Sequence, residues 1–157
     1  MVELTEAFVA ALEAAGVHAM AAMPPETAPR LKAAAVGVGV TELEASPGGF
    51  SAYLGVQEGR ELYGLRLKAK MRLDVLSPAS LGAAACRAAL DSAREVLAGG
   101  VEGVSILAVS AQAPAYDPVG DCFRARLEAD CRCWLCAGAD ADDPAALTHF
   151  ILKGALT

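Results

Sequence analysis

Aromatic side chains are scarce in this chain, so large rings cannot fill most of its interior. They make up only 5% of the 157 residues, and the apolar content of 55% is raised by alanine instead. These proportions predict a core of small aliphatic side chains in which helices approach a sheet closely. The length suits one domain that buries its core without disulfides or metals. We therefore expect residues 1–157 to form a single domain.

The chain also lacks an excess of basic residues and a long apolar run. Its formal net charge is −6, whereas recognition of phosphates usually needs a basic surface. No apolar run approaches the roughly 18 to 20 residues of a membrane span, and no basic segment precedes an apolar run at the N-terminus. The sequence therefore predicts a cytoplasmic protein with neither a specific nucleic acid nor a membrane as partner.

Cysteine is present in an odd number, five, and no signal peptide is evident. Free thiols are therefore expected. Cys131, Cys133 and Cys136, preceded by Cys122, are the only cluster that resembles metal ligands. A structural zinc site needs four converging ligands, but Cys131 and Cys133 fall on one face of a predicted strand and Cys136 on the other. We interpret these cysteines as small apolar side chains and predict no metal and no cofactor.

Histidine is limited to His18 and His149, and neither belongs to a motif for nucleophilic catalysis. Residues 49–53, Gly-Phe-Ser-Ala-Tyr, lack the closing glycine of a nucleophile elbow. Residues 37–40, Gly-Val-Gly-Val, lie inside a predicted strand without the helix and the lysine of a phosphate loop. We expect another backbone to approach closely at these glycines. The sequence thus predicts that the chain is not an enzyme.

Two long alternating segments, residues 63–76 and 123–136, are the main positive feature of the sequence. Odd-numbered positions such as Leu67, Leu73 and Leu127 are apolar, and most even-numbered positions carry charge. Successive side chains of a strand point to opposite faces. The pattern predicts two strands of a sheet that has one face on a core and one face exposed.

The remaining elements follow from apolar spacing and from turn residues. Helical spacing that ends at glycine predicts helices at residues 4–15 and 79–98. Shorter alternating stretches predict strands at residues 35–44, 50–56, 104–111 and 148–153, with 17–23 as a further candidate. Proline and acidic residues predict connections at 24–30, 116–120 and 140–144. Residues 138–157 are expected to form an acidic linker and a C-terminal edge segment.

This order predicts an α+β fold in a single domain. We expect a mainly antiparallel twisted sheet of about five to seven strands, with two helices packed on one face.

Four basic residues form a row on the charged face of the first long strand: Arg66, Lys68, Lys70 and Arg72. Like charges side by side destabilise a sheet unless acidic groups lie opposite. Glu128 and Asp130 of the second long strand are candidates for internal pairing. The alternative is that the row forms a subunit interface or faces phosphate, and the sequence leaves both open.

Several segments resemble small tail proteins encoded in Firmicutes-type prophages. They are residues 72–78, Arg-Leu-Asp-Val-Leu-Ser-Pro, with the helix start 82–86, Gly-Ala-Ala-Ala-Cys; residues 49–55; residues 116–118 ahead of Trp134-Leu135; and residues 150–154. The order of helices and strands is also similar to the tail-terminator fold of long-tailed phages.

The resemblance implies a tail terminator or tail-completion protein with a structural role in virion assembly. Such proteins form a ring, commonly of six subunits, on the tail tube and contact neck or head-completion proteins. The expected location is the cytoplasm during assembly and then the virion tail. No family site residues transfer to this chain.

On this hypothesis, the assembly interface comprises Arg66, Lys68, Lys70, Arg72, Tyr116 and Asp117, together with the loops at 24–30 and 116–121. The alternative function is a cytosolic small-molecule-binding domain or enzyme that uses a cleft between the sheet and the second helix.

Overall fold

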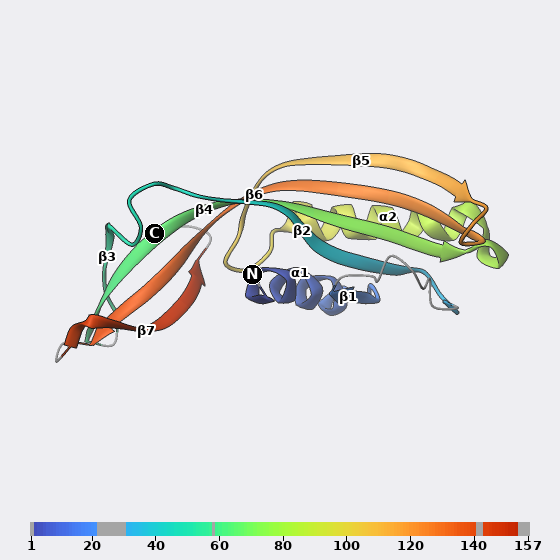
Figure 1. Cartoon of the computed structure of the whole chain (residues 1–157). Helices are drawn as coiled ribbons and strands as arrows, with labels where there is room; N and C mark the ends of the chain where they lie inside the picture. Colours follow the sequence, from blue (N-terminus) through green and yellow to red (C-terminus); the bar gives the residue numbers. More distant parts are fainter. Residues whose placement is uncertain (1, 22–30, 58, 141–142, 154–157) are drawn as a thin grey trace.

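A computed structural model describes residues 2–21, 31–57, 59–140 and 143–153. In these ranges, two α-helices pack against one face of a seven-stranded, mainly antiparallel sheet (Figure 1). The predicted α+β class and single domain are confirmed. The elements in chain order are α1 (Val2–Ala14), β1 (Ala19–Ala21), β2 (Ala35–Ala45), β3 (Ala52–Gln57), β4 (Arg60–Pro78), the 3-10 helix η1 (Ala79–Leu81), α2 (Gly82–Gly99), β5 (Ser105–Asp117), β6 (Cys122–Asp140) and β7 (Asp143–Lys153).

The long strands β4 and β6 form a ribbon that runs through the whole domain. They pair antiparallel from Glu61 opposite Ala139 to Pro78 opposite Cys122. β2 and β5 flank one part of this ribbon, and β3 and β7 flank the other part. The sheet therefore has two lobes, which we call the helix-covered lobe (β1-β2-β4-β6-β5) and the tip lobe (β3-β4-β6-β7).

The core lies between the two helices and the helix-covered lobe. In the helix-covered lobe, the odd-numbered side chains of β4 and β6 are buried in this core, as the sequence predicts. Alanine at positions 69, 93, 125 and 129 lets α2 lie close to the sheet, as expected from the composition. The largest fully buried side chains of this core are Phe8, Leu12, Met71, Leu73, Leu127, Val36, Val38 and Val75.

The buried side of the ribbon changes in the tip lobe, where the predicted alternation is wrong. Leu62 and Gly64 are buried, whereas Tyr63 remains partly exposed. Gly64 lies against side chains of β3 and β6, namely Leu54 and Trp134. Even-numbered positions therefore become buried here, because neighbouring strands rather than the helices supply the packing.

Several boundaries differ from the sequence-based prediction. β5 continues through Asp117, beyond the expected end at residue 111. Asp140 ends β6 and lies opposite Asp143, the first residue of β7, so both residues belong to strands rather than to a linker. Within the described part of the candidate strand at 17–23, the strand is β1 (Ala19–Ala21), which pairs parallel with β2, and residues 22–23 lie outside the described residues. The expected loop at 24–30 lies outside the described residues.

The expected close backbone approach at residues 37–40 is wrong at Gly39. A Cβ added there would meet no heavy atom within 4 Å. At Gly64, by contrast, a Cβ would lie 2.6 Å from Leu54 Cδ1 and 2.8 Å from Trp134 Cε3. Of these two strand glycines, only Gly64 lies where a side chain would collide with its neighbours.

We predict that Gly64→Ala lowers the free energy of unfolding by about 1–3 kcal/mol, because the added methyl group displaces the Trp134 ring. The matched variant Gly39→Ala should change it by no more than about 0.5 kcal/mol. Urea unfolding followed by circular dichroism measures both values. Equal effects of the two variants would contradict the packing described for the tip lobe.

Candidate functional site

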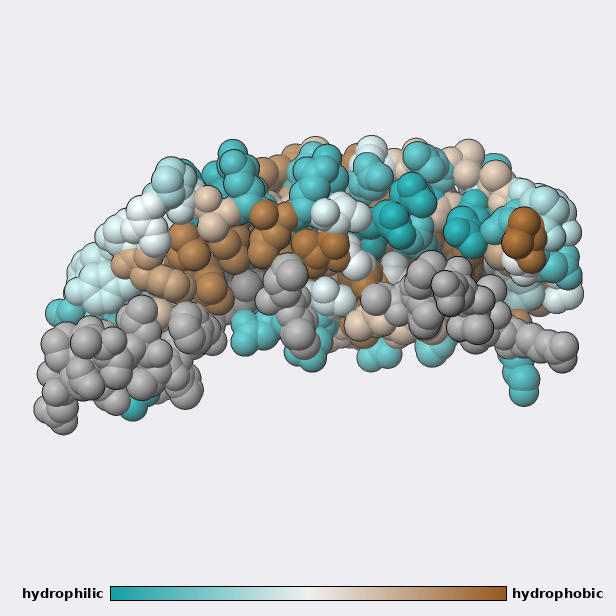
Figure 2. Space-filling view, in the orientation of Figure 1, coloured by the Kyte–Doolittle hydropathy of each residue, from teal (hydrophilic) through white to brown (hydrophobic). Residues whose placement is uncertain are grey.

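The face of the helix-covered lobe opposite the helices carries many charged side chains, and we call it the outer face. Figure 2 shows hydrophilic side chains interspersed with apolar ones along the upper side of the molecule, and hydrophobic ones gathered below, left of centre. Seven basic and five acidic residues contribute, in contrast to the negative charge of the whole chain. They are Glu42 and Glu44 of β2; Arg66, Lys68, Lys70, Arg72 and Asp74 of β4; and Arg124, Arg126, Glu128, Asp130 and Arg132 of β6.

Acidic residues of β6 lie opposite the basic row, but the row forms its ion pairs with other acidic residues. Lys70 faces Asp130 and Arg72 faces Glu128 in the strand register. Lys70 Nζ nevertheless lies 3.5 Å from Glu42 Oε1, and Arg72 Nε lies 2.8 Å from Asp74 Oδ2. Arg66 donates a hydrogen bond of 3.4 Å to the Ser46 hydroxyl. Within the described chain, neither Glu128 nor Asp130 takes part in an ion pair, so the partners expected from the sequence are not the ones used.

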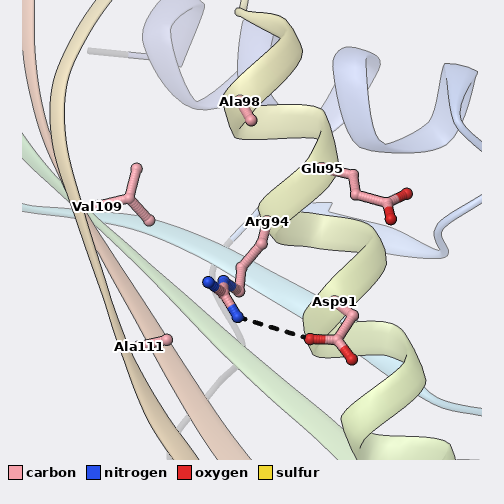
Figure 3. A pocket seen from close by; sticks show the side chains of 6 residues that line it. All are labelled: Asp91, Arg94, Glu95, Ala98, Val109 and Ala111. Carbon is pink, nitrogen blue, oxygen red and sulfur yellow. Dashed lines mark ion pairs between the residues drawn. The ribbon is translucent and has the colours of Figure 1, made fainter.

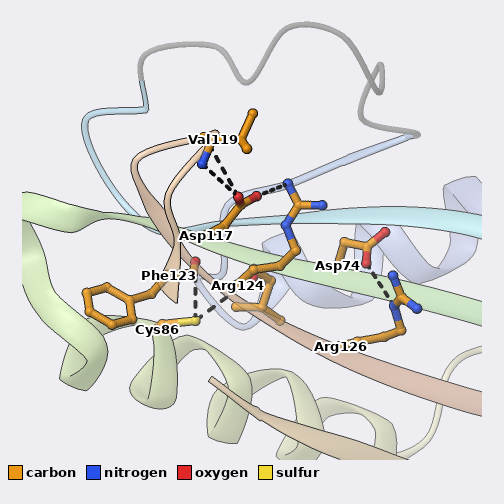
Figure 4. Close-up of polar contacts among 9 residues, drawn as sticks. Asp74, Cys86, Asp117, Val119, Phe123, Arg124 and Arg126 are labelled. Carbon is orange, nitrogen blue, oxygen red and sulfur yellow. Dashed lines mark hydrogen bonds and ion pairs between the residues drawn. The ribbon is translucent and has the colours of Figure 1, made fainter. Parts of the chain in front are cut away.

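Arg124 and Arg126 lie near the β5–β6 turn, and Arg72 is linked to Arg126 through Asp74; we call these three residues the arginine cluster. Asp74, whose side chain is only 18% exposed, accepts hydrogen bonds from Arg72 Nε at 2.8 Å and from Arg126 Nε at 3.2 Å. Arg124 Nη2 lies 3.0 Å from Asp117 Oδ2 (Figure 4). Each guanidinium has five N–H donors. These contacts use only part of that capacity, so the cluster can bind a further anionic group.

Asp117 connects the arginine cluster to the β5–β6 turn. Its Oδ1 accepts hydrogen bonds from the backbone N–H groups of Val119 at 3.0 Å and Gly120 at 3.4 Å. A groove of about 320 Å³ lies beside this turn, and Gln112, Asp117, Arg124 and Arg126 contribute to its lining. The turn therefore holds Arg124 at the edge of a concave, positively charged surface.

Tyr116 lies next to Asp117 but pairs with Phe123 on the helix-covered side of the sheet. The two rings are 5.5 Å apart between centroids, and the Tyr116 hydroxyl donates to Asp121 Oδ1 at 2.9 Å. This hydrogen bond, together with the charge of Asp121, raises the pKa of Tyr116. The predicted interface residues thus divide. Arg72 and Asp117 belong to the ion pairs of the cluster, and Arg66, Lys68 and Lys70 lie further along β4. Tyr116 packs against Phe123 and also contributes to the lining of the groove.

Arg124, Arg126 and Asp74 were not selected as site residues from the sequence. All three residues have even numbers, which places them on the charged face of their strands. This alternation is the sequence signal that could have identified them. Their grouping depends on the register that sets Asp74 opposite Arg126, and the sequence alone does not specify this register.

A second concave region lies between α2 and β5, where the alternative hypothesis expects a cleft. It has a volume of about 520 Å³. Its lining consists of Asp91, Arg94, Glu95 and Ala98 of α2 with Val109 and Ala111 of β5 (Figure 3). All six residues are exposed. Small-molecule sites usually bury most of the ligand against apolar side chains, so this region is an open groove rather than an enclosed pocket.

None of the five cysteines forms a disulfide, and all five are buried. Cys131 and Cys133 belong to the main core, whereas Cys136 lies on the opposite face of β6, as its position in the strand predicts. Burial raises the pKa of the Cys131 thiol to about 12. Cys86 lies near the carbonyl oxygens of Val75 and Phe123. Among the described residues, no group of three or more His, Cys, Asp or Glu side chains converges as a metal site would require.

No protein-family model matches the chain, and no curated protein matches it. The described part of the chain contains no helix with the length and apolar character needed to cross a membrane.

We expect Asp74→Asn to lower the free energy of unfolding by about 1 kcal/mol at low salt, because two arginines lose their shared carboxylate. The matched variant Asp130→Asn should have an effect within about 0.5 kcal/mol, since no ion pair involves Asp130 among the described residues. Urea unfolding at low and high salt measures both, and the Asp74 effect should shrink with salt. An Asp130 effect as large as that of Asp74 would refute the assignment.

The native cysteines should react slowly with an aromatic disulfide reagent at pH 8. Burial blocks access to all five thiols, and at Cys131 a pKa of about 12 also leaves only a small fraction as thiolate at that pH. Absorbance should report little thiol release from native protein and five thiols after denaturation. Rapid release of even one thiol from the folded protein would contradict the burial of that residue.

Proposed function

We propose that this chain is a structural component of phage tails, a tail terminator or tail-completion protein. It works by assembling with copies of itself into a ring at the end of the tail tube and by contacting neck or head-completion proteins. The resemblance of several sequence segments to prophage tail proteins motivates the proposal. The structural observation that supports it best is the regular stretch of residues 108–112 at the edge of β5.

β5 is a 13-residue strand that pairs only with β6 among the described strands. Its residues from Ser105 to Tyr116 include no charged side chain, and Leu107 and Val109 are 56% and 42% exposed. Monomeric proteins usually protect such edges with charge, proline or bulges. β5 carries two of these devices, Pro114 and the register shifts after Ile106 and after Gln112, and between the shifts residues 108–112 remain as a regular stretch without charge, proline or bulge. This stretch offers backbone donors and acceptors to another chain.

The open groove between α2 and β5 favours the assembly function over the small-molecule alternative. Its exposed lining includes the Arg94–Asp91 ion pair, with 3.7 Å between Nη1 and Oδ1. Val109 belongs both to this groove and to the β5 edge. A protein partner can cover the edge and the groove together, whereas a small ligand would remain largely in water.

Electron microscopy of particles from an induced prophage tests the proposed function. An early stop codon in the gene should yield overlong or headless tails, because tube growth is not stopped and heads cannot join. Complementation with the wild-type gene should restore normal particles, and Val109→Lys, within residues 108–112, should fail to do so because its charge blocks pairing at the β5 edge. Leu81→Lys, at an exposed leucine of η1, is the matched control and should complement.

Normal infectious particles from the stop-codon strain would exclude a role in tail completion. That result would direct attention to ligand screening of the purified protein. Equal complementation by both lysine variants would leave the tail role intact but remove β5 as its structural basis.

A further inference from the structure

The groove beside the β5–β6 turn has a structural cause in β5. Gln112 pairs with Arg126 and Ala115 pairs with Arg124, so two residues of β5 but only one of β6 lie between the paired positions. Such a bulge bends its strand and disturbs the pairing locally. The groove of about 320 Å³ lies at this bend, and Gln112, Arg124 and Arg126 contribute to its lining. The irregularity thus places two arginines of β6 in a concave part of the outer face.

Each of these two arginines contacts a carboxylate through only part of its guanidinium group. Arg126 Nε lies 3.2 Å from Asp74 Oδ1, and Arg124 Nη2 lies 3.0 Å from Asp117 Oδ2 (Figure 4). No other hydrogen bond or ion pair joins either guanidinium to the described part of the chain. Both Nη groups of Arg126, and Nε and Nη1 of Arg124, therefore remain as donors. The two aspartates orient the arginines without saturating them.

The local charge favours a carboxylate as the group that these donors bind. The three arginines of the cluster directly contact two carboxylates, those of Asp74 and Asp117, which leaves one positive charge among the groups in contact. One carboxylate balances this charge, whereas a phosphate monoester carries more negative charge and would lie close to both aspartates. The net charge of −6 further opposes a polyanion such as nucleic acid. Guanidinium and carboxylate also match in geometry, because they form paired, charge-assisted hydrogen bonds.

The exposure of the two arginines favours a protein over a small molecule as the source of that carboxylate. Their side chains are 47% exposed at Arg124 and 34% exposed at Arg126. An ion pair that remains in water contributes little, so a small acid in the groove would be bound weakly. A protein that covers the groove excludes water and strengthens the same contact. Apolar residues also contribute to the lining and can pack against small apolar neighbours of the carboxylate: Ala113, Ala115 and Pro118.

We infer that this groove is a docking site for a segment of a partner protein that presents an acidic side chain between small apolar residues. Arg124 and Arg126 bind the carboxylate, and Asp74 and Asp117 position the two arginines. The contact uses side chains of the outer face, whereas the proposed self-assembly uses the backbone edge of β5. Self-assembly thus has its own surface, so we assign the groove to a protein other than this chain. The inference goes beyond self-assembly and does not require it.

A nuclear magnetic resonance titration with two peptides tests the inference. The probe is acetyl-Ala-Ala-Glu-Ala-Ala-amide, and its counterpart carries glutamine in place of glutamate. The glutamate peptide should shift the Nε–H resonances of Arg124 and Arg126 in a saturable way, and added salt should weaken its binding. The glutamine peptide should bind at least about tenfold more weakly, because its neutral amide cannot accept charge-assisted hydrogen bonds.

Three variants assign the binding to the groove. Arg124→Gln combined with Arg126→Gln should weaken binding of the glutamate peptide at least about tenfold, because both charged donors are lost. Arg124→Lys keeps the charge but lacks the paired donors, so its affinity should lie between those of the wild type and the double variant. The matched control Arg132→Gln changes an arginine of β6 outside the groove and should bind as the wild type does. Circular dichroism verifies the fold of each variant.

Two results of the titration would overturn the inference. The carboxylate site is wrong if the glutamate peptide gives no saturable shift, or if the glutamine peptide binds equally well. If inorganic phosphate displaces the glutamate peptide at a lower concentration than the peptide itself needs, the groove is a phosphate site and not a docking site for an acidic segment.

Native mass spectrometry separates this inference from the proposed function. The variant with Arg124→Gln and Arg126→Gln should keep the oligomers of the wild type, because the β5 edge is unchanged. Loss of those oligomers would show that the groove binds a second copy of the chain, which contradicts its assignment to another protein. A wild type that stays monomeric at every concentration but binds the glutamate peptide would reject self-assembly and support the docking site.

Discussion

The antiparallel pairing of β4 with β6 is the constraint on which the rest of the structure depends. Its register sets Leu73 opposite Leu127 and Asp74 opposite Arg126. The leucine pair lies in the core and the Asp74–Arg126 pair lies on the outer face, so the same register fixes both contacts. A shift by one residue would bring the charges onto the helices and the leucines into water. The core, the charged field and the arginine cluster therefore form together or not at all.

The outer face combines many charges with few strong interactions. Most of its ion pairs are exposed on at least one side, and such pairs contribute little to stability. Asp74 differs from the other charged residues of this face, because its side chain is mostly buried and forms ion pairs with two arginines. The charges therefore determine what the surface can bind more than how firmly the domain folds. A surface of this kind suits recognition of another protein.

The net charge and its distribution have different consequences for assembly. A net charge of −6 makes free copies repel one another at long range, which favours solubility before assembly. The uncharged β5 edge adds backbone hydrogen bonding without contributing to the repulsion. In the proposed ring, long-range repulsion and backbone pairing at the β5 edge would together favour ordered over random association.

The alternation of β4 and β6 in the helix-covered lobe was predictable, because a strand has a period of two and Leu67 to Val75 and Ala125 to Cys133 obey it. The class of the fold followed from the same patterns and the two helical segments. The change of buried face at Gly64 was not predictable, because periodicity tells which side chains share a face but not what covers it. That cover comes from Leu54 and Trp134, on different strands.

The ion pairs show the same limit of prediction from the sequence. The sequence identified the basic row and offered Glu128 and Asp130 as partners, but the structure pairs the row with Glu42 and Asp74. The choice depends on the irregularity after Val40 in β2 and on side-chain conformations, both of which are properties of the packed sheet. Local pattern thus specified the elements and their two faces. Only the tertiary structure decided which charges meet, because these contacts join residues that are distant in the chain.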